Sequence, residues 1–144
     1  DLSGAQPRLL RPGSILARDI EALIGPLSTP ADAEGPRASG RLAAHYAPAK
    51  SLQLVSAEQL PSALATASPD DLWLAAGALP AACSGIALSD QAEAYGRELY
   101  AALRALDARP GARIRVLLPP QDLRWAAVHD RLKRAAAGGG QSAP

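Results

Sequence analysis

The sequence predicts an α/β protein: a small open Rossmann-like sheet with helices on both faces, preceded by a linker and a short amphipathic helix. Short apolar segments with the composition of buried strands lie at 52–55, 72–74, 84–88 and 113–118. Two longer segments, 91–107 and 122–137, have apolar residues at helical spacing. Because strands that alternate with helices pair in parallel and leave the helices on the sheet faces, this order predicts the fold class.

Capping patterns support the predicted helices. Asp90 and Glu93 stand where a helix over 91–107 needs an N-cap residue and its partner three positions later. Ser56 and Gln59 have the same spacing after the first predicted strand, and they indicate the start of another helix. Each pattern would satisfy backbone amides that the first turn of a helix leaves without partners.

Changes in composition divide the chain into four regions. Residues 1–27 contain turn residues and then an amphipathic helix over 14–24, and we interpret them as the end of a preceding unit. Residues 28–50 begin with a stretch dense in Pro, Gly, Ala and Asp and are predicted to be an interdomain linker. Residues 51–137 form the predicted small domain, and residues 138–144 a disordered tail.

Composition and charge narrow the function classes. A chain that is 48% hydrophobic and 20% charged, with a formal net charge of +1, is typical of a folded soluble protein. Lys and Arg form no block interleaved with aromatic residues, so we expect no direct nucleic-acid binding. Without a long apolar run or a signal-peptide pattern, we expect a cytoplasmic protein with no membrane contact. The single cysteine, Cys83, suits a reducing compartment and is expected to be a small buried hydrophobe.

Motifs for common active sites are missing from the sequence. The glycines from Gly138 to Gly140 are not followed by the Lys and Ser or Thr of a phosphate-binding loop. His45 and His129 stand on separate elements and predict no metal site. No nucleophile motif is present, so we expect no catalytic residue in this chain. Since the chain has no Met and begins at Asp1, we expect it to be a piece of a longer product.

Two short segments are candidates for ligand contact. His45, Tyr46 and Pro48 lie in a loop of otherwise small residues, and large polar-tipped side chains in loops often contact ligands. Alternatively, Tyr46 seals the edge of the core and His45 stays in water. Arg11 precedes a Pro-Gly turn, and its guanidinium either binds phosphate oxygens or points into solvent. Composition alone favours the structural interpretation of His45 and Tyr46 and the solvent-facing interpretation of Arg11.

We assign no binding role to the charged residues on the predicted helices. Arg131, Lys133 and Arg134 are interpreted as a solvated face and as cations that complement the C-terminus of the last helix. Asp19 and Glu21 lie on the surface of the first helix, and the sequence indicates no partner for them.

Three parts of the sequence together carry a resemblance to a known family, and they occur in the same order as in that family. They are Leu9 to Ile15, then Ser39 to Pro48, then 95–107 with 113–118 and 130–136. Together they resemble the two-domain threonylcarbamoyl-AMP synthases. The first is similar to the Leu-Arg-Pro-Gly end of the family's YrdC-like catalytic domain. The second is similar to the linker motif that ends in His-Tyr-Ala-Pro, and the third to the end of the C-terminal domain.

The resemblance implies an enzyme that joins threonine, bicarbonate and ATP, with magnesium, into threonylcarbamoyl adenylate and pyrophosphate for tRNA threonylcarbamoyladenosine modification. It implies that residues 1–27 end a catalytic domain that lies mostly upstream, and that this chain is a lid and regulatory portion without activity of its own. Arg11 and Tyr46 carry over from the family as hypothetical nucleotide-binding residues. Gly40, His45, Tyr46 and Pro48 carry over as the linker or lid.

A different class of function stays open at this point. A freestanding Rossmann-like module that binds a ligand or a partner, with no enzymatic parent, would have the same composition and helix pattern. A small independent hydrolase is disfavoured because no nucleophile motif is present. Finding the catalytic domain in frame upstream of Asp1 would separate the synthase from both alternatives.

Overall fold

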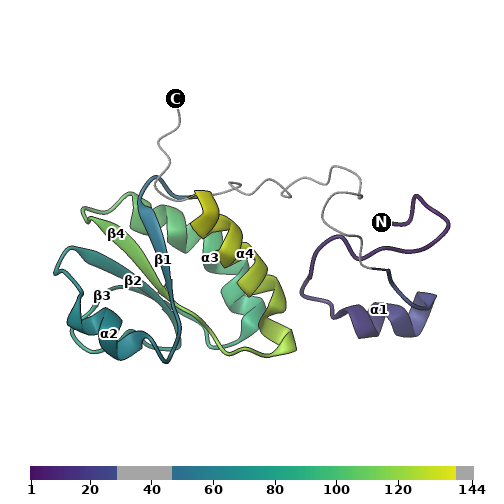
Figure 1. Ribbon diagram of the computed structural model, residues 1–144, viewed down its shortest axis with the longest axis horizontal. Helices are drawn as coiled ribbons and strands as arrows, with labels where there is room; N and C mark the ends of the chain where they lie inside the picture. The colour runs from purple at the N-terminus through teal and green to yellow at the C-terminus, as the bar shows by residue number, and fades with distance from the viewer. Residues whose placement is uncertain (29–46, 139–144) are drawn as a thin grey trace.

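The computed structural model describes residues 1–28 and 47–138 (Figure 1). These residues confirm the predicted fold class, a parallel sheet with helices on both faces. The elements in chain order are α1 (Ala17–Ile24), β1 (Ser51–Val55), α2 (Leu60–Ala65), β2 (Asp71–Ala76), β3 (Ser84–Leu88), α3 (Ala92–Asp107), β4 (Arg113–Leu117), a 3-10 turn η1 (Leu123–Trp125) and α4 (Ala126–Gly138). No helix among them is long and apolar enough to cross a membrane.

The four strands form one parallel sheet in the order β1-β4-β2-β3. The last strand in the sequence therefore lies inside the sheet, between the first two. Its residue Ile114 pairs with Leu52 of β1 on one side and with Leu72 of β2 on the other. Ile114 is fully buried, as expected for a residue with neighbouring strands on both sides.

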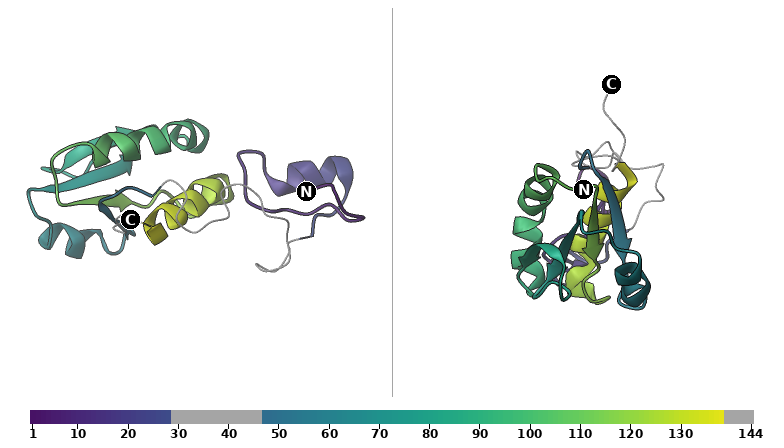
Figure 2. Two further views of the ribbon diagram at one scale, coloured as in Figure 1. Left: turned by 90° about the horizontal axis from the view of Figure 1, so that it is seen from above. Right: turned by 90° about the vertical axis from the view of Figure 1, so that its left-hand side faces the viewer.

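Alternate residues of each strand point to opposite faces of the sheet, and the hydrophobic cores on the two faces differ in size. Helices α3 and α4 cover the larger core, which includes Leu72, Leu74 and Leu99. The smaller α2 covers the other face, where the core cluster contains Val55 and Trp73. Figure 2 shows α2 and α3 on opposite sides of the sheet.

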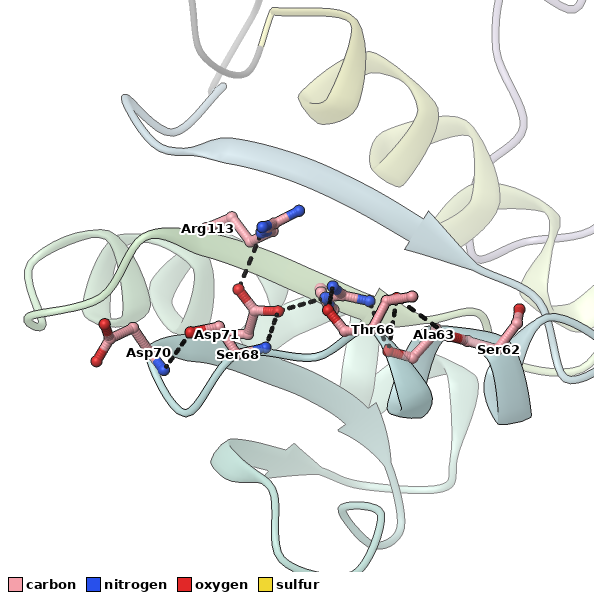
Figure 3. Close-up of polar contacts among 8 residues, drawn as sticks. Ser62, Ala63, Thr66, Ser68, Asp70, Asp71 and Arg113 are labelled. Carbon is pink, nitrogen blue, oxygen red and sulfur yellow. Dashed lines mark hydrogen bonds and ion pairs between the residues drawn. The ribbon is translucent and has the colours of Figure 1, made fainter.

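A buried ion pair connects β2 and β4 on the α2 side of the sheet (Figure 3). The Asp71 side chain is fully buried, and its Oδ2 accepts a 2.7 Å hydrogen bond from Nε of Arg115. Its other oxygen, Oδ1, lies 2.9 Å from Nε of Arg113, and the backbone amide of Ser68 donates to Oδ2 at 3.1 Å. Oδ2 is thus hydrogen-bonded, whereas Oδ1 accepts no hydrogen bond and is balanced by the nearby charge of Arg113.

The Arg115 guanidinium extends this network to α2. Its two terminal nitrogens donate to the carbonyl oxygens of Ala63 at 2.8 Å and Thr66 at 3.1 Å. These carbonyls belong to the end of α2, where a helix leaves acceptors without partners in its own backbone. The guanidinium also lies 5.6 Å from the ring centre of Trp73. One arginine therefore joins two strands and a helix.

The capping predictions had different outcomes. The reciprocal hydrogen bonds of the predicted cap form: the Ser56 amide donates to the Gln59 side chain at 3.0 Å and the Gln59 amide donates to the Ser56 hydroxyl at 3.2 Å. They close the turn that precedes α2, whose own N-cap residue, Gln59, makes no side-chain cap. The predicted cap at Asp90 is wrong, because Gln91 is the extended residue before α3 and no side chain caps it. The Asp90 carboxylate instead accepts from the side-chain amide of Gln91 at 3.1 Å.

The first and last helices differ from their predicted bounds. The sequence predicted 14–24, but α1 begins at Ala17 because Leu16 is extended. None of its residues is buried, and Leu23 is 85% exposed. At the other end of the chain, Asp122 caps η1 rather than α4 by accepting from the Arg124 amide at 2.8 Å. Helix α4 then continues to Gly138, one residue past the predicted end.

Replacing Asp71 by Asn is expected to lower the free energy of unfolding by about 3–5 kcal/mol, because Arg115 would keep a buried charge without its partner. The neighbouring Asp70 is exposed, so Asp70→Asn makes the same chemical change without that cost and is expected to shift stability by less than about 0.5 kcal/mol. Urea denaturation followed by tryptophan fluorescence measures both. Equal stability losses in the two variants would show that the ion pair is not structural.

Candidate functional site

The structure describes only part of the predicted site. Gly40, His45 and Tyr46 lie outside the described residues, so their predicted roles stay predictions. Pro48 is buried, and Arg11 is partly buried. The structure does not bring these two together into one site: Pro48 lies against the C-terminal half of α3, whereas Arg11 lies against α4.

Asp107, the last residue of α3, holds the chain directly after Pro48. Its carboxylate accepts from the backbone amide of Ala49 at 3.0 Å and from that of Lys50 at 2.9 Å. The Lys50 ammonium lies 3.9 Å from the same carboxylate and also donates to the Asp107 carbonyl oxygen. A lysine at this position satisfies an acceptor that the helix end leaves open and complements its partial negative charge. The chain is therefore fixed to α3 before it enters β1.

A small cavity of about 180 Å³ lies beside this contact. It is bounded by Ala47 and Pro48 on one side and by Tyr100, Leu103 and Arg104 of α3 on the other. The burial of Pro48 thus places the end of the predicted linker on α3.

Arg11 makes the second contact, with Asp130 of α4. Its Nε and Nη2 donate to Oδ2 of Asp130 at 3.1 and 2.8 Å, across 119 residues of sequence. Arg134, one helical turn after Asp130, donates from Nε and Nη2 to Oδ1, both at 3.1 Å. One carboxylate therefore binds two guanidinium groups.

The surroundings of Asp130 keep it ionised. Partial burial alone would raise the pKa of its carboxyl group. The hydrogen bonds and positive charges of Arg134 and Arg11 outweigh that effect, so the pKa lies below the ordinary value of an aspartate. At neutral pH the side chain is a stable anion and a poor general base.

A groove of about 1070 Å³ separates the N-terminal segment from α3 and α4. Arg11, Pro12 and Ser14 line one side, and residues of both helices, including Arg97 and Arg131, line the other. Polar and apolar side chains both contribute to its walls. Such a mixed surface can bind either another part of a protein or a small ligand.

Two of the charged residues on α4 are not the solvated face that the sequence predicted. Lys133 is exposed, but Arg131 and Arg134 are partly buried. Nη1 of Arg131 donates to the Gly96 carbonyl of α3 at 2.7 Å, so this residue ties the two helices together. No basic residue lies in the last turn of α4, and the predicted complement to the helix C-terminus is therefore wrong as well.

His129 and Cys83, the remaining side chains that could take part in chemistry, are packed into the small domain. His129 is buried, and its Nε2 lies 3.0 Å from the Pro120 carbonyl oxygen. Cys83 packs against the core cluster under α2, and burial raises the pKa of its thiol although the charge of Arg115 partly opposes this. Within residues 1–28 and 47–138, no three His, Cys, Asp or Glu side chains are grouped so that they could hold a metal ion.

The sequence analysis did not identify Asp107 or Asp130 as a contact residue, although the position of each aspartate gives a local indication. An aspartate in the last turn of a helix, such as Asp107, is unfavourable unless a cation or backbone amides accompany it. Asp130 and Arg134 have the i,i+4 spacing of a helical ion pair. The pairing of Asp130 with Arg11 has no such local trace, since the two residues come from opposite ends of the chain.

Comparisons with known proteins agree with this architecture. The family model described as threonylcarbamoyl-AMP synthase, C-terminal domain, matches residues 15–137. The crystal structure of P. abyssi Sua5 complexed with L-threonine superposes with a TM-score of 0.74 at 24% sequence identity, covering 96% of this chain and 44% of that one. A P. abyssi Sua5 variant with an adjacent histidine and tyrosine replaced by alanine gives a TM-score of 0.69 at 22% identity, with the same coverage.

At these identities the likeness to the solved structures shows the fold. A search of the curated proteins finds no match to the sequence. The chain spans less than half the length of the P. abyssi protein that it matches.

Replacing Asp107 by Asn is expected to speed hydrogen exchange at the amides of Ala49 and Lys50 by about tenfold or more, because both lose a charged acceptor. Asp122→Asn is the matched control, since Asp122 also accepts from a backbone amide but on a different element. Exchange measured by NMR at residues 49 and 50 should respond to the first change and not to the second. Unaltered exchange in Asp107→Asn would mean that this carboxylate does not hold the linker end.

Proposed function

The chain belongs to the family of threonylcarbamoyl-AMP synthase C-terminal domains, and we propose that it is the lid-bearing and regulatory part of such a synthase. The match of the family model to residues 15–137, nearly the whole chain, is the observation that carries this proposal. The four-stranded parallel sheet is consistent with it, because it is the fold shared with P. abyssi Sua5.

In this proposal the complete protein joins threonine, bicarbonate and ATP into threonylcarbamoyl adenylate and releases pyrophosphate. The product is then used to modify an adenosine of tRNA. Its reactive bond is a mixed anhydride, which water destroys, so the reaction needs a cover that excludes solvent while the product forms. This chain supplies the cover and its support, whereas the groups that react with the substrates belong to a YrdC-like catalytic domain upstream.

The division of the chain follows from the same proposal. Residues 1–27 end the catalytic domain, residues 28–50 form the interdomain linker, and residues 51–137 are the C-terminal domain. Gly40, His45, Tyr46 and Pro48 belong to the cover. A variant of P. abyssi Sua5 has an adjacent histidine and tyrosine replaced by alanine. His45 and Tyr46 are likewise adjacent in this chain, which supports the choice of this pair as part of the cover.

Arg11 and Tyr46 are the proposed nucleotide contacts. A guanidinium presents several N–H groups in one plane and binds phosphate oxygens through two of them at once. Magnesium in this proposal enters with ATP and is held by the catalytic domain.

Arg11→Ala and Tyr46→Ala, each introduced into the intact polypeptide with its catalytic domain, are expected to lower the rate of threonylcarbamoyl adenylate formation by about tenfold or more. Arg18→Ala is the matched control, because Arg18 is an exposed arginine close in sequence to Arg11 and is expected to leave the rate unchanged.

Product formation followed by chromatography with labelled threonine measures all three variants. Full activity in both Arg11→Ala and Tyr46→Ala would remove the cover and nucleotide-contact assignments. Failure of the intact wild-type polypeptide to make the product would instead favour a freestanding binding module.

A further inference from the structure

Asp130 is shielded from solvent more than the exposed ion pairs of this chain. The side chains of Asp130, Arg11 and Arg134 are 20%, 24% and 24% exposed. In the surface pair of Arg97 and Glu93, by comparison, both side chains are 71% exposed. An exposed pair contributes little because water competes for both charges, whereas a shielded network of three charges holds its geometry better.

The backbone that carries Asp130 is firmly held. Its neighbours Val128 and Leu132 are buried in the core beneath α4. Arg131 adds a 2.7 Å hydrogen bond from α4 to the Gly96 carbonyl of α3. The Asp130 carboxylate is therefore a fixed point on the small domain.

The N-terminal segment, in contrast, is folded mostly on itself. The amide of Leu9 donates to the Ser28 carbonyl at 2.8 Å, and the amide of Ser28 donates to the Pro7 carbonyl at 3.0 Å. Helix α1 buries none of its residues. The hydrogen bonds from Arg11 to Asp130 cross from this segment to the small domain, so they fix the position of the turn that begins at Arg11.

These contacts exclude a direct chemical role for Asp130. Both of its oxygens accept hydrogen bonds from guanidinium groups, and its lowered pKa makes it a weak proton acceptor. What the geometry does provide is orientation: Nε and Nη2 of Arg11 are held by one oxygen, so rotation about the long side chain is restricted.

Building on the function proposed above, we propose that Asp130 is a positioning residue that holds the Arg11 guanidinium ready for the phosphates of ATP. A free arginine side chain loses much rotational freedom when it binds a ligand, and a side chain that is already held loses less. The C-terminal domain thereby contributes to ATP affinity through a residue that does not touch the nucleotide.

Asp130→Asn in the intact enzyme is expected to raise KM for ATP about fivefold while kcat changes less than about twofold, because the restraint on Arg11 acts on binding before the chemical step. Asp130→Glu keeps the charge and is expected to restore most of the affinity. Asp70→Asn, an exposed aspartate on the small domain, is the control and should leave KM unchanged. Thermal unfolding of each variant separates loss of folding from loss of positioning.

The 144-residue chain gives a readout that does not depend on activity. The Nε–H signal of Arg11 in an NMR spectrum of this chain should shift and exchange faster with water in Asp130→Asn, and return toward its original position in Asp130→Glu. An unshifted signal, or a shifted signal with an unchanged KM for ATP, would overturn the positioning role. If the wild-type enzyme makes no product, the proposed function fails and the role of Asp130 toward ATP falls with it, even where the NMR shift shows the ion pair.

Discussion

A buried ion pair between Asp71 and Arg115 holds the sheet together where the hydrophobic core is thin. The sequence contains no Phe, and the core cluster beneath α2 consists of Val55, Ala63 and Trp73 with a few partly buried neighbours. A fully paired arginine replaces apolar packing there and connects β2, β4 and the end of α2. Because β4 lies between β1 and β2, this connection holds the two central strands of the sheet side by side.

Those two helices carry the acidic residues that hold the rest of the chain. Asp107 at the end of α3 binds the backbone at residues 49 and 50, and Asp130 on α4 binds Arg11. The described segments on either side of residues 29–46 are thus both attached to the small domain, each through a carboxylate. In this way the domain provides fixed positions for its neighbours, as the proposed supporting role requires.

The sequence predicted those features that depend on residues close together in the chain. Helix α3 and the cap formed by Ser56 and Gln59 follow from local spacing, and the parallel sheet follows from the alternation of helices and strands. The cap at Asp90 was predicted wrongly, because α3 begins at Ala92 and Gln91 therefore occupies the N-cap position. Arg115 occupies a strand position that faces α2, and its partner lies 44 residues away, so no local pattern indicates the buried pair. The family resemblance supplied the proposed nucleotide and linker roles, which spacing alone could not.

Pyrophosphate release from ATP, in the presence of threonine and bicarbonate, tests most directly whether this chain supports chemistry that belongs to another domain. The measurement compares the 144-residue chain with the intact polypeptide that includes the catalytic domain. We expect release by the intact polypeptide and none by the chain alone. Release by the chain alone, at a rate comparable to that of the intact polypeptide, would contradict the account, because the reacting groups would then lie within these residues.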